Sequence, residues 1–411
     1  MNVNETRIME RIEAFSKFNE NPEFGISRFS YGKEDAEARK WLLQVCRELD
    51  LSISVDPVGN IRARYEGKDP TLAPIMIGSH MDSVRNGGKY DGIVGVVGAL
   101  EVLSVMRDYE YQPKRAIELV VFAEEEGSNF GTTMVGSKAL TGKLSLEEME
   151  VLHTENGENA IEVLEKFGLH PADMDAYILK STDVDAMLEL HIEQGIVLER
   201  EKKRLGVVQA IAGMTTLEVT ISGESNHAGA TPMNMRSDPM SAAAILITKI
   251  EEVAAHQVLE STVATVGSIC CKPNMPNVIP GEVVFTVDIR DIDAGAIQDT
   301  IQKIEKYAKI ISEERGVQIA FRTIGTSSPI ALSPRIKAVI EKAVAKCSDS
   351  WMKMNSGAVH DAAMMASVTD VGMIFVPSVR GKSHNKEEYT EASDITLRCQ
   401  ALLLSVCSLC E

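Results

Sequence analysis

The sequence predicts an α/β protein with a mostly parallel sheet, into which a smaller ferredoxin-like α+β domain is inserted. Three observations lead to this prediction. Apolar runs of strand length alternate with amphipathic helical segments in the first half of the chain, as at 72–77 and 92–108. A βαββαβ order then fills about 210–326. The alternation of helix and strand resumes at 327, so the small unit is interpreted as an insertion.

The first part, 1–209, contains regular alternation with one polar interruption. A polar, charged stretch from about 141 to 183 indicates short helices. Helices are otherwise expected at 5–18, 34–49 and 92–108, and strands at 51–56, 60–65, 72–77, 116–123 and 186–192. In the last part, 327–411, a helix at 333–346 precedes the strand "VGMIFVPS".

The inserted part, 210–326, has a different pattern. "TTLEVTISG" alternates apolar and polar residues like a half-exposed strand, and the helix that follows has Asp238 at its start. The remaining expected elements are two strands, a long helix and a final strand, at 261–271, 282–291, 294–316 and 317–325. This order predicts a ferredoxin-like unit.

Composition restricts the partners of the protein. The net charge is −18, from 60 acidic and 42 basic residues. A field of this sign repels nucleic acid and anionic membranes, and no basic cluster offsets it, so neither is expected as a partner. No apolar run of membrane-spanning length is evident, and the first residues do not resemble a secretion signal. The cysteines number seven and several lie in apolar segments, as Cys46, Cys270 and Cys271 do, which predicts reduced, mostly buried thiols in a cytoplasmic protein.

Histidine and carboxylate side chains follow several of the predicted strands. The carboxyl ends of parallel strands meet at one edge of a sheet, so these side chains are expected to converge. They are His80, Asp82 and Asp91 in "GSHMDSVRNGGKYDG", Glu124, Glu125 and Glu126 in "FAEEEGSNFG", His191 in "LELHIEQG", and His384 in "VPSVRGKSHN". For "GSHMDSVRNGGKYDG" alone, a polar turn in which Asp91 caps the next helix is the favoured interpretation, and the rest of the chain has to decide.

The residue types predict a metal site. Imidazole and carboxylate ligands without thiolate suit zinc or manganese, and two such ions can share a bridging carboxylate. Asp91, between His80 and a glutamate, is the natural bridge. A neighbouring free glutamate can then take a proton from water at the site. Asp82 is expected to hold the His80 ring in one tautomer.

Six motifs resemble one known family. They are "GSHMDSVRNGGKYDG", "AEEEGSNFGTTMVGS", "LELHIEQG", "GESNHAGATPM", "PNVIPG" and "SGAVHDA". Together, in order and over nearly the whole chain, they resemble the amidase/hydantoinase/carbamoylase branch of the two-metal aminoacylase and carboxypeptidase hydrolases. The resemblance implies a homodimer and two divalent ions. It also implies Glu125 as general base and a set of metal ligands, His80, Asp91, Glu126, His191 and His384, with Asp91 bridging.

The resemblance also implies substrate-binding residues, most of them in the insertion. His227 in "SNHAGATP" matches a histidine that holds the substrate's carbonyl oxygen from the partner subunit. Asn277 and Arg290 match residues that bind the substrate carboxylate, for which a guanidinium is physically suited. Gln194 and His360 are expected in the substrate pocket. Val359 replaces the commoner small residue before this histidine.

The function predicted is hydrolysis of a linear C–N bond in a ureido or carbamoyl group next to a carboxylate. Allantoate and an N-carbamoyl-L-amino acid both remain possible substrates. An aminoacylase or dipeptidase on the same scaffold is one alternative, and a non-catalytic binding module is another.

Overall fold

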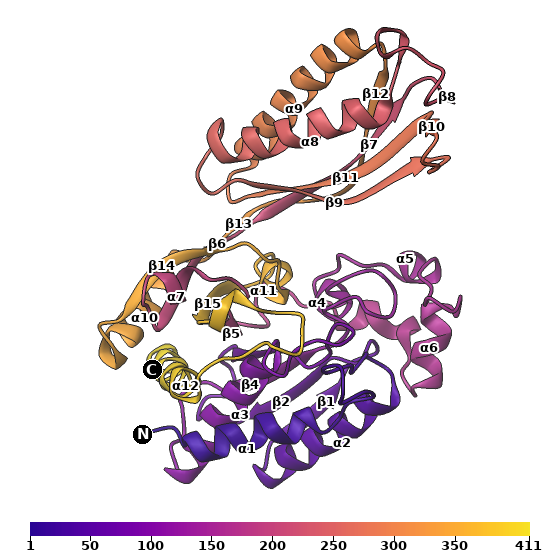
Figure 1. Ribbon diagram of the computed structural model, residues 1–411. Helices are drawn as coiled ribbons and strands as arrows, with labels where there is room; N and C mark the ends of the chain where they lie inside the picture. The colour runs from indigo at the N-terminus through magenta and orange to yellow at the C-terminus, as the bar shows by residue number, and fades with distance from the viewer. The chain divides into compact units, whose positions relative to one another are not determined.

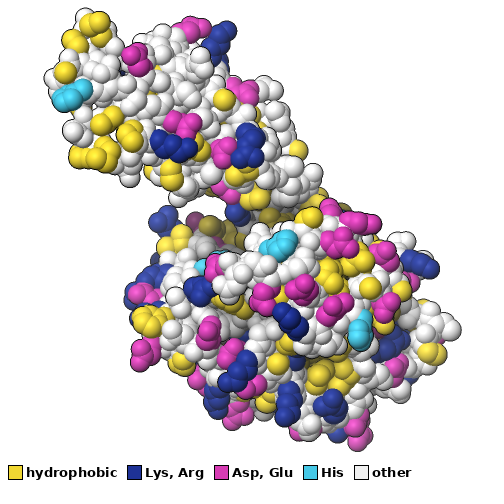
Figure 2. Space-filling view, turned by 90° about the vertical axis from the view of Figure 1, so that its right-hand side faces the viewer, with side chains coloured by type: hydrophobic (Ala, Val, Ile, Leu, Met, Phe, Trp, Pro, Cys, Tyr) yellow, Lys and Arg dark blue, Asp and Glu magenta, His cyan; other side chains and the backbone are white.

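The computed structural model describes residues 1–411 and divides into two compact units (Figure 1). Unit 1 comprises Met1–Gln209 and Leu332–Glu411, and unit 2 comprises Ala210–Ala331. Each is described by itself. On the face drawn in Figure 2, acidic and basic side chains intermingle over the surface of unit 1.

A nine-stranded sheet has its centre in unit 1, in the order β1-β2-β4-β3-β5-β15-β6-β13, with β14 beside β6; β13 and the last two residues of β6 belong to unit 2. Its middle strands β4, β3, β5 and β15 run parallel, as predicted, whereas the pairings toward both edges are antiparallel. The strands are β1 (Ser52–Val55), β2 (Ile61–Tyr65), β3 (Ile75–His80), β4 (Ile117–Phe122), β5 (Ala186–Ile192), β6 (Leu205–Ile211), β13 (Ile330–Ala331), β14 (Trp351–Ser356) and β15 (Asp370–Val376).

The main core of unit 1 lies between this sheet and its longer helices. Alternate residues of β3 and β5, such as Ile77 and Leu190, enter this core. The intervening residues, among them His80 and His191, therefore point to the opposite face. The helices that share the core are α1 (Glu5–Ser16), α2 (Lys33–Glu48), α3 (Ile93–Asp108), α10 (Pro334–Cys347) and α12 (Ala392–Leu409).

Unit 1 also contains several shorter helices. Some of them lie in the polar stretch 141–183, where short helices were predicted. They are α4 (Val135–Leu140), α5 (Leu146–Glu150), α6 (Ala160–Lys166), η1 (Pro171–Tyr177), α7 (Val197–Arg200), α11 (Asp361–Met365) and η3 (Val379–Gly381). A second, smaller core lies beneath α4, α5 and α6.

Unit 2 has the predicted βαββαβ order. Its sheet runs β12-β7-β11-β9 with every pair antiparallel, and α8 and α9 cover one face through residues such as Leu246 and Ile304. The elements are β7 (Gly213–Ser222), β8 (Asn226–His227), η2 (Met233–Met235), α8 (Pro239–His256), β9 (Val263–Lys272), β10 (Val278–Ile279), β11 (Glu282–Asp291), α9 (Ala294–Arg315) and β12 (Gln318–Ser327).

Three sequence-based expectations need correction. Strand β3 continues to His80, so this histidine ends a strand and does not lie in the loop after it. Cys270 is exposed and Cys271 half-buried, because β9 is an edge strand with little covering it. Finally, α12 is long and apolar enough to span a membrane by length and composition, but Leu402 and Val406 lie in the core.

Candidate metal centre

Two neighbouring parallel strands present the first histidines. His80 ends β3 and His191 lies near the end of β5, on the same face of the sheet. Their Nε2 atoms are 3.5 Å apart, and both rings are buried. Carbonyl oxygens of Asp82 and Ile192 lie 3.1 Å and 3.0 Å from their respective Nδ1 atoms. These contacts orient both Nε2 atoms toward the same point.

Asp91 lies in the loop between β3 and α3. The N-cap of α3 is Gly92, without a side-chain cap hydrogen bond, so the interpretation of Asp91 as a helix cap is wrong. Gly92 has φ +65°, and a Cβ there would lie 2.5 Å from the His80 ring. Glycine therefore permits the close approach that brings Asp91 beside His80.

The carboxylate of Asp91 is divided between two clusters. Its Oδ1 lies 3.1 Å from His191 Nε2 and 3.7 Å from His80 Nε2. Its Oδ2 lies 3.2 Å from His384 Nε2, and Glu126 Oε2 is 3.5 Å from the same nitrogen. The geometry accordingly forms two candidate ion sites that share one carboxylate, the first with His80 and His191 and the second with Glu126 and His384.

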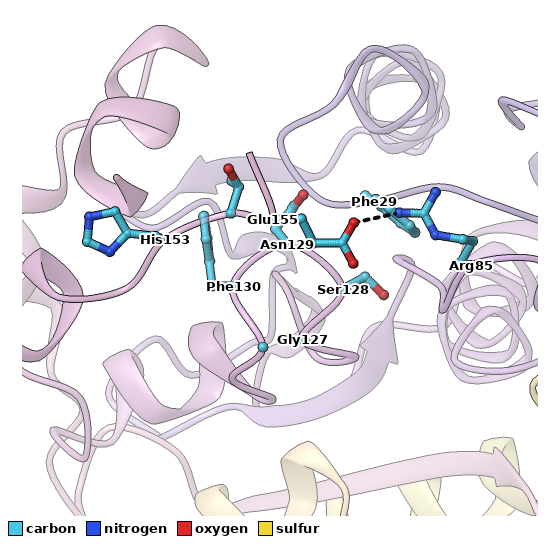
Figure 3. Close-up of a pocket in the computed structure, with 10 residues that line it drawn as sticks. Phe29, Arg85, Gly127, Ser128, Asn129, Phe130, His153 and Glu155 are labelled. Carbon is cyan, nitrogen blue, oxygen red and sulfur yellow. Dashed lines mark hydrogen bonds and ion pairs between the residues drawn. The ribbon is translucent and has the colours of Figure 1, made fainter. Parts of the chain in front are cut away.

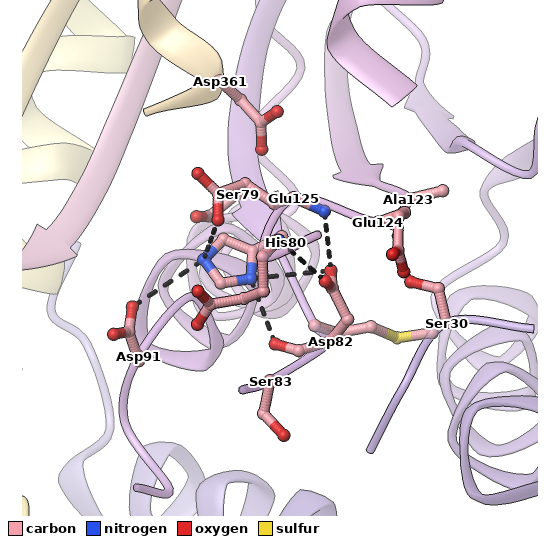
Figure 4. Close-up of polar contacts among 12 residues, drawn as sticks. Ser30, Ser79, His80, Asp82, Ser83, Asp91, Ala123, Glu124, Glu125 and Asp361 are labelled. Atoms are coloured by element: carbon pink, nitrogen blue, oxygen red, sulfur yellow. Dashed lines mark hydrogen bonds and ion pairs between the residues drawn. The ribbon is translucent and has the colours of Figure 1, made fainter. Parts of the chain in front are cut away.

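Glu125 and Asp82 connect this arrangement to the end of β4. Glu125 Oε2 lies 3.7 Å from His80 Nε2. The Asp82 carboxylate accepts the backbone N–H groups of Glu125 and Glu126, at 3.2 Å and 3.0 Å, and its Oδ1 is 3.7 Å from His80 Nδ1 (Figure 4). Asp82 thus contacts the His80 ring and also fixes the backbone that carries the two glutamates.

The donor set fits divalent ions. Asp91 Oδ1 and Glu126 Oε1 are buried without a hydrogen-bond partner. Burial and the neighbouring Glu126 raise the pKa of Glu125 well above its usual value, and burial and Asp91 do the same for Glu126. Although burial favours neutral imidazole, Asp91 raises the pKa of His191 to about 9. Crowded carboxylates of this kind are stabilised by a cation, and imidazole with carboxylate suits zinc or manganese.

Two predicted substrate residues of unit 1 lie beside the clusters. Gln194 Nε2 donates to Asp91 Oδ2 at 2.7 Å and lies 3.3 Å from His384 Nε2. The buried His360 ring lies 4.4 Å from that of His191, centroid to centroid, and its Nε2 contacts Ser356 Oγ at 3.0 Å. Burial and His191 lower the pKa of His360, so this ring is neutral.

The predicted residues of unit 2 are separated within that unit. His227 is exposed in β8, and its Nδ1 accepts the N–H groups of Gly229 and Ala230 at 3.1 Å. The neighbouring Ala228 donates its N–H to the Asn277 carbonyl at 3.0 Å, so Asn277 lies beside His227. Arg290 is near the far end of β11, where its Nε pairs with Asp288 at 2.7 Å.

The buried carboxylates near the centre that were not predicted include Glu189 and Glu388. Glu189 accepts the Ser79 hydroxyl at 2.7 Å and the Ala362 N–H at 3.1 Å. Its place two residues before His191 on a strand was a usable signal, since both share a face. Glu388 accepts the backbone N–H of Asp91, but its position in the charged run "NKEEY" gives no such signal.

A separate cavity of about 420 Å³ contains none of the candidate ligands. It lies against the loop 127–131, which follows the glutamates, and Arg85 and Glu155 face one another across it at 3.3 Å (Figure 3). The Arg85 guanidinium also stacks over Phe29, 5.0 Å from the ring centroid. None of the residues predicted to bind substrate lines this cavity.

A parallel sheet whose carboxyl edge holds two histidine–carboxylate clusters around one shared aspartate defines a candidate dinuclear metallohydrolase centre. Comparison with known proteins agrees with this class. The model of peptidase family M20/M25/M40 matches residues 76–407, and the chain belongs to this family.

Relatives match over nearly their full length. The chain is 37% identical over 398 residues to an N-carbamoyl-L-amino-acid amidohydrolase of Paenarthrobacter aurescens, covering 97% of this chain and 96% of the relative. It is 34% identical over 412 residues to a ureidoglycolate hydrolase of Oryza sativa subsp. japonica, covering 99% and 85%. The crystal structure of a hydantoinase/carbamoylase family amidase from Burkholderia multivorans has a TM-score of 0.93 and 32% identity, covering 100% and 99%.

Proposed function

We propose that this protein is a metal-dependent amidohydrolase that cleaves the linear C–N bond of a ureido or carbamoyl group on a small carboxylate. The division of Asp91 between two histidine–carboxylate clusters, with Glu125 beside them, carries the proposal. Two zinc or manganese ions there would supply Lewis acidity and lower the pKa of water. Their proposed ligands are His80, Asp91, Glu126, His191 and His384.

Glu125 is the proposed general base. It lies beside the ligand Glu126 at the end of β4, and Asp82 fixes its backbone. Its carboxylate takes a proton from the attacking water and returns it to the leaving nitrogen.

The substrate carboxylate needs a local cation, since the net charge of −18 repels an anion at long range. Arg290 fits this role because its guanidinium can donate two parallel hydrogen bonds to a carboxylate. Asn277 is proposed to bind the same group, and Gln194 and His360 to contact the rest of the substrate beside the metal clusters. His227 is proposed to stabilise the oxyanion that develops on the carbonyl oxygen.

The spacing within unit 2 supports a homodimer. His227 lies beside β10, which leads into β11 at Glu282, whereas Arg290 stands near the other end of β11. A strand rises about 3.4 Å per residue, so the part of β11 from Glu282 to Arg290 alone spans roughly 27 Å. A carbamoyl group and a carboxylate held on one carbon are much closer together. One copy of unit 2 is therefore not expected to apply both residues to one substrate, and a second copy is proposed to supply His227 together with its neighbour Asn277.

Two alternatives are weighed against this proposal. An aminoacylase or dipeptidase would use the same ions and the same base, so the centre alone does not separate these activities. A non-catalytic binding module is disfavoured because the proposed ligands and Glu125 converge in one place, with His80, Asp91, His191 and Glu125 buried there and His384 at its exposed edge. The relatives act on carbamoyl and ureido compounds, and this favours amidohydrolysis.

A substrate panel tests the proposal. The protein loaded with manganese or zinc is incubated with allantoate, ureidoglycolate, N-carbamoyl-L-amino acids, N-acetyl amino acids and dipeptides, and ammonia and free amine are measured. We expect ammonia from a ureido or carbamoyl substrate and none from the Glu125→Gln variant under the same conditions. Amine release from acetylated amino acids or dipeptides alone would instead support the aminoacylase or dipeptidase.

A further inference from the structure

Glu388 links the loop that carries His384 to the loop that carries Asp91. It is buried, and its Oε1 accepts the backbone N–H groups of Tyr90 and Asp91, at 2.9 Å and 3.1 Å. Its Oε2 accepts the hydroxyl of Ser383 at 3.0 Å. The two oxygens of the Glu388 side chain therefore hold two segments together. Tyr90 and Glu388, which make one of these contacts, are 298 positions apart in the sequence.

Ser383 extends this link to the Asp91 side chain. Its Oγ lies 3.0 Å from Asp91 Oδ2, the oxygen that faces His384 at 3.2 Å. Both the backbone and the carboxylate of Asp91 are thus connected to the segment 383–388, which includes His384 itself. The arrangement restrains the distance between the shared carboxylate and the one proposed ligand that comes from the last part of the chain.

The packing around Glu388 matches this role. A Cβ on Gly88 would lie 2.1 Å from Glu388 Oε1, so the close approach of the two loops requires glycine there. None of the hydrogen bonds to the Glu388 carboxylate comes from a Lys or Arg side chain. An unpaired buried carboxylate is expensive for folding alone, and a role at the neighbouring centre accounts for it better.

We propose that Glu388, acting with Ser383, is a positioning residue of the metal centre. It holds Asp91 Oδ2 and His384 at the separation needed to bind the ion that they share with Glu126. This inference rests on the proposed function only in taking these three residues as ligands. It adds a requirement outside the ligand set, and it predicts that the ion at this cluster depends on Glu388 more than the ion at the His80–His191 cluster.

The affinity for metal tests this directly, independently of substrate. Dissociation constants for Zn²⁺ and Mn²⁺ are measured by chelator competition on the full chain carrying Glu388→Ala, Glu388→Gln or Ser383→Ala. Loss of a residue that orients ligands typically lowers metal affinity by about 10- to 100-fold, which is the effect expected for Glu388→Ala. We expect this loss at one of two ions, with the other retained.

The glutamine variant separates geometry from charge. Its amide oxygen can accept the same two N–H groups and its NH₂ group can donate to Ser383, so Glu388→Gln should bind both ions with near wild-type affinity. Ser383→Ala removes one hydroxyl and should keep the fold while weakening the same ion. Asp291→Ala is the matched control, because Asp291 is a buried carboxylate of unit 2 that also accepts a backbone N–H and hydroxyl groups.

Wild-type affinity for both ions in Glu388→Ala and Ser383→Ala would overturn the inference. An equal loss in Asp291→Ala would overturn it as well, because the effect would then reflect general destabilisation. If Glu388→Ala does not fold, Ser383→Ala decides between these outcomes. Failure of the ligand assignment is recognised separately, since the wild-type protein would then bind neither ion, and failure of the proposed amidohydrolase activity is recognised by the substrate panel.

Discussion

Asp91 shows at the scale of one residue how the centre is organised. Its two oxygens face different histidines, Gln194 donates to the oxygen on the His384 side, and Ser383 Oγ lies 3.0 Å from that same oxygen. The proposed ligands come from four separate strand ends or loops, so the shared aspartate is what joins them. Removing any single histidine should therefore affect metal binding more than folding of the sheet.

We expect His80→Ala and His384→Ala to lose bound metal and nearly all turnover, because each removes an imidazole from one cluster. Elemental analysis of the purified variants measures this. His153→Ala is the control, since His153 is an exposed histidine of the same unit and contacts only the Val151 carbonyl, at 3.0 Å. Full metal content in both cluster variants would contradict the ligand assignment.

Glu125→Gln should retain both ions while lowering kcat by about 100-fold or more, the scale of general acid–base catalysis. The amide keeps the size of the side chain but cannot take up the proton. Metal analysis and steady-state kinetics on the best substrate of the panel measure the two effects. A near-normal kcat would move the role of base to another carboxylate, with the buried Glu124 as the next candidate.

A pattern of histidine and carboxylate residues in a sequence points to candidate metal ligands. It does not reveal side chains that act by accepting hydrogen bonds from the backbone beside those ligands. His80, Asp91, His191 and His384 were predicted as ligands because each lies at or after the end of a predictable strand, and their binding of metal stays a prediction. Glu388 was missed because a buried carboxylate that accepts N–H groups looks the same in sequence as a solvated one. The same limit applies to Asp82, whose carboxylate accepts the N–H groups of Glu125 and Glu126, a contact that no spacing rule predicts.

At the scale of elements, the position of α3 under the sheet controls the position of His80. Gly95 on α3 lies so close to β3 and β5 that an added Cβ would be 2.4 Å from the Leu190 carbonyl oxygen and 2.5 Å from Ser79 Cβ. Gly98, one turn later, would meet its nearest neighbours at 3.4 Å or more. The two glycines of α3 are thus a matched pair of sites: a side chain at Gly95 would clash with the strands, and one at Gly98 would make ordinary van der Waals contacts.

We expect Gly95→Ala to lower the free energy of unfolding by about 1–3 kcal/mol, because the helix must move away from the strands. It should also weaken metal binding, since Ser79 precedes His80. Gly98→Ala should be neutral or stabilising by up to about 1 kcal/mol, the gain in helix propensity. Urea unfolding of the two metal-free variants measures their free energies of unfolding. Equal changes in the free energy of unfolding for the two substitutions would contradict this account.

Most strands were predictable, including edge strands such as β1, β9 and β12, but β6 and β14 were not. β11 was predicted at its observed limits, because apolar and polar residues alternate throughout it. β6 was missed, because "LGVVQAI" follows the charged segment 199–204 and has no turn signal of its own. β14 alternates only weakly, and its pairing with β6 depends on tertiary context.

At the scale of the whole molecule, the proposed dimer has a direct test. An inactive Glu125→Gln chain is mixed with an inactive His227→Ala chain under conditions that allow subunit exchange. If His227 acts in the partner's site, each mixed dimer contains one intact site, and random exchange in a twofold dimer restores roughly a quarter of wild-type activity. Confirmed exchange without recovered activity would show that His227 does not act across the dimer.

The connections to unit 2 run beside one another at its base. Ala210 and Ile211 in β6 pair with Ala331 and Ile330 in β13, antiparallel, so the chain leaves and returns at the same place. β6 and β13 therefore pair like the two strands of a β-hairpin, and the chain between Ile211 and Ile330 takes the place of the hairpin turn. Replacing only the segment between Ile211 and Ile330 with a short turn would keep both β6 and β13, and so would leave the strand order of the host sheet formally unchanged. Such an attachment point lets an ancestral protein gain, exchange or lose the smaller unit without redesign of the metal-binding framework.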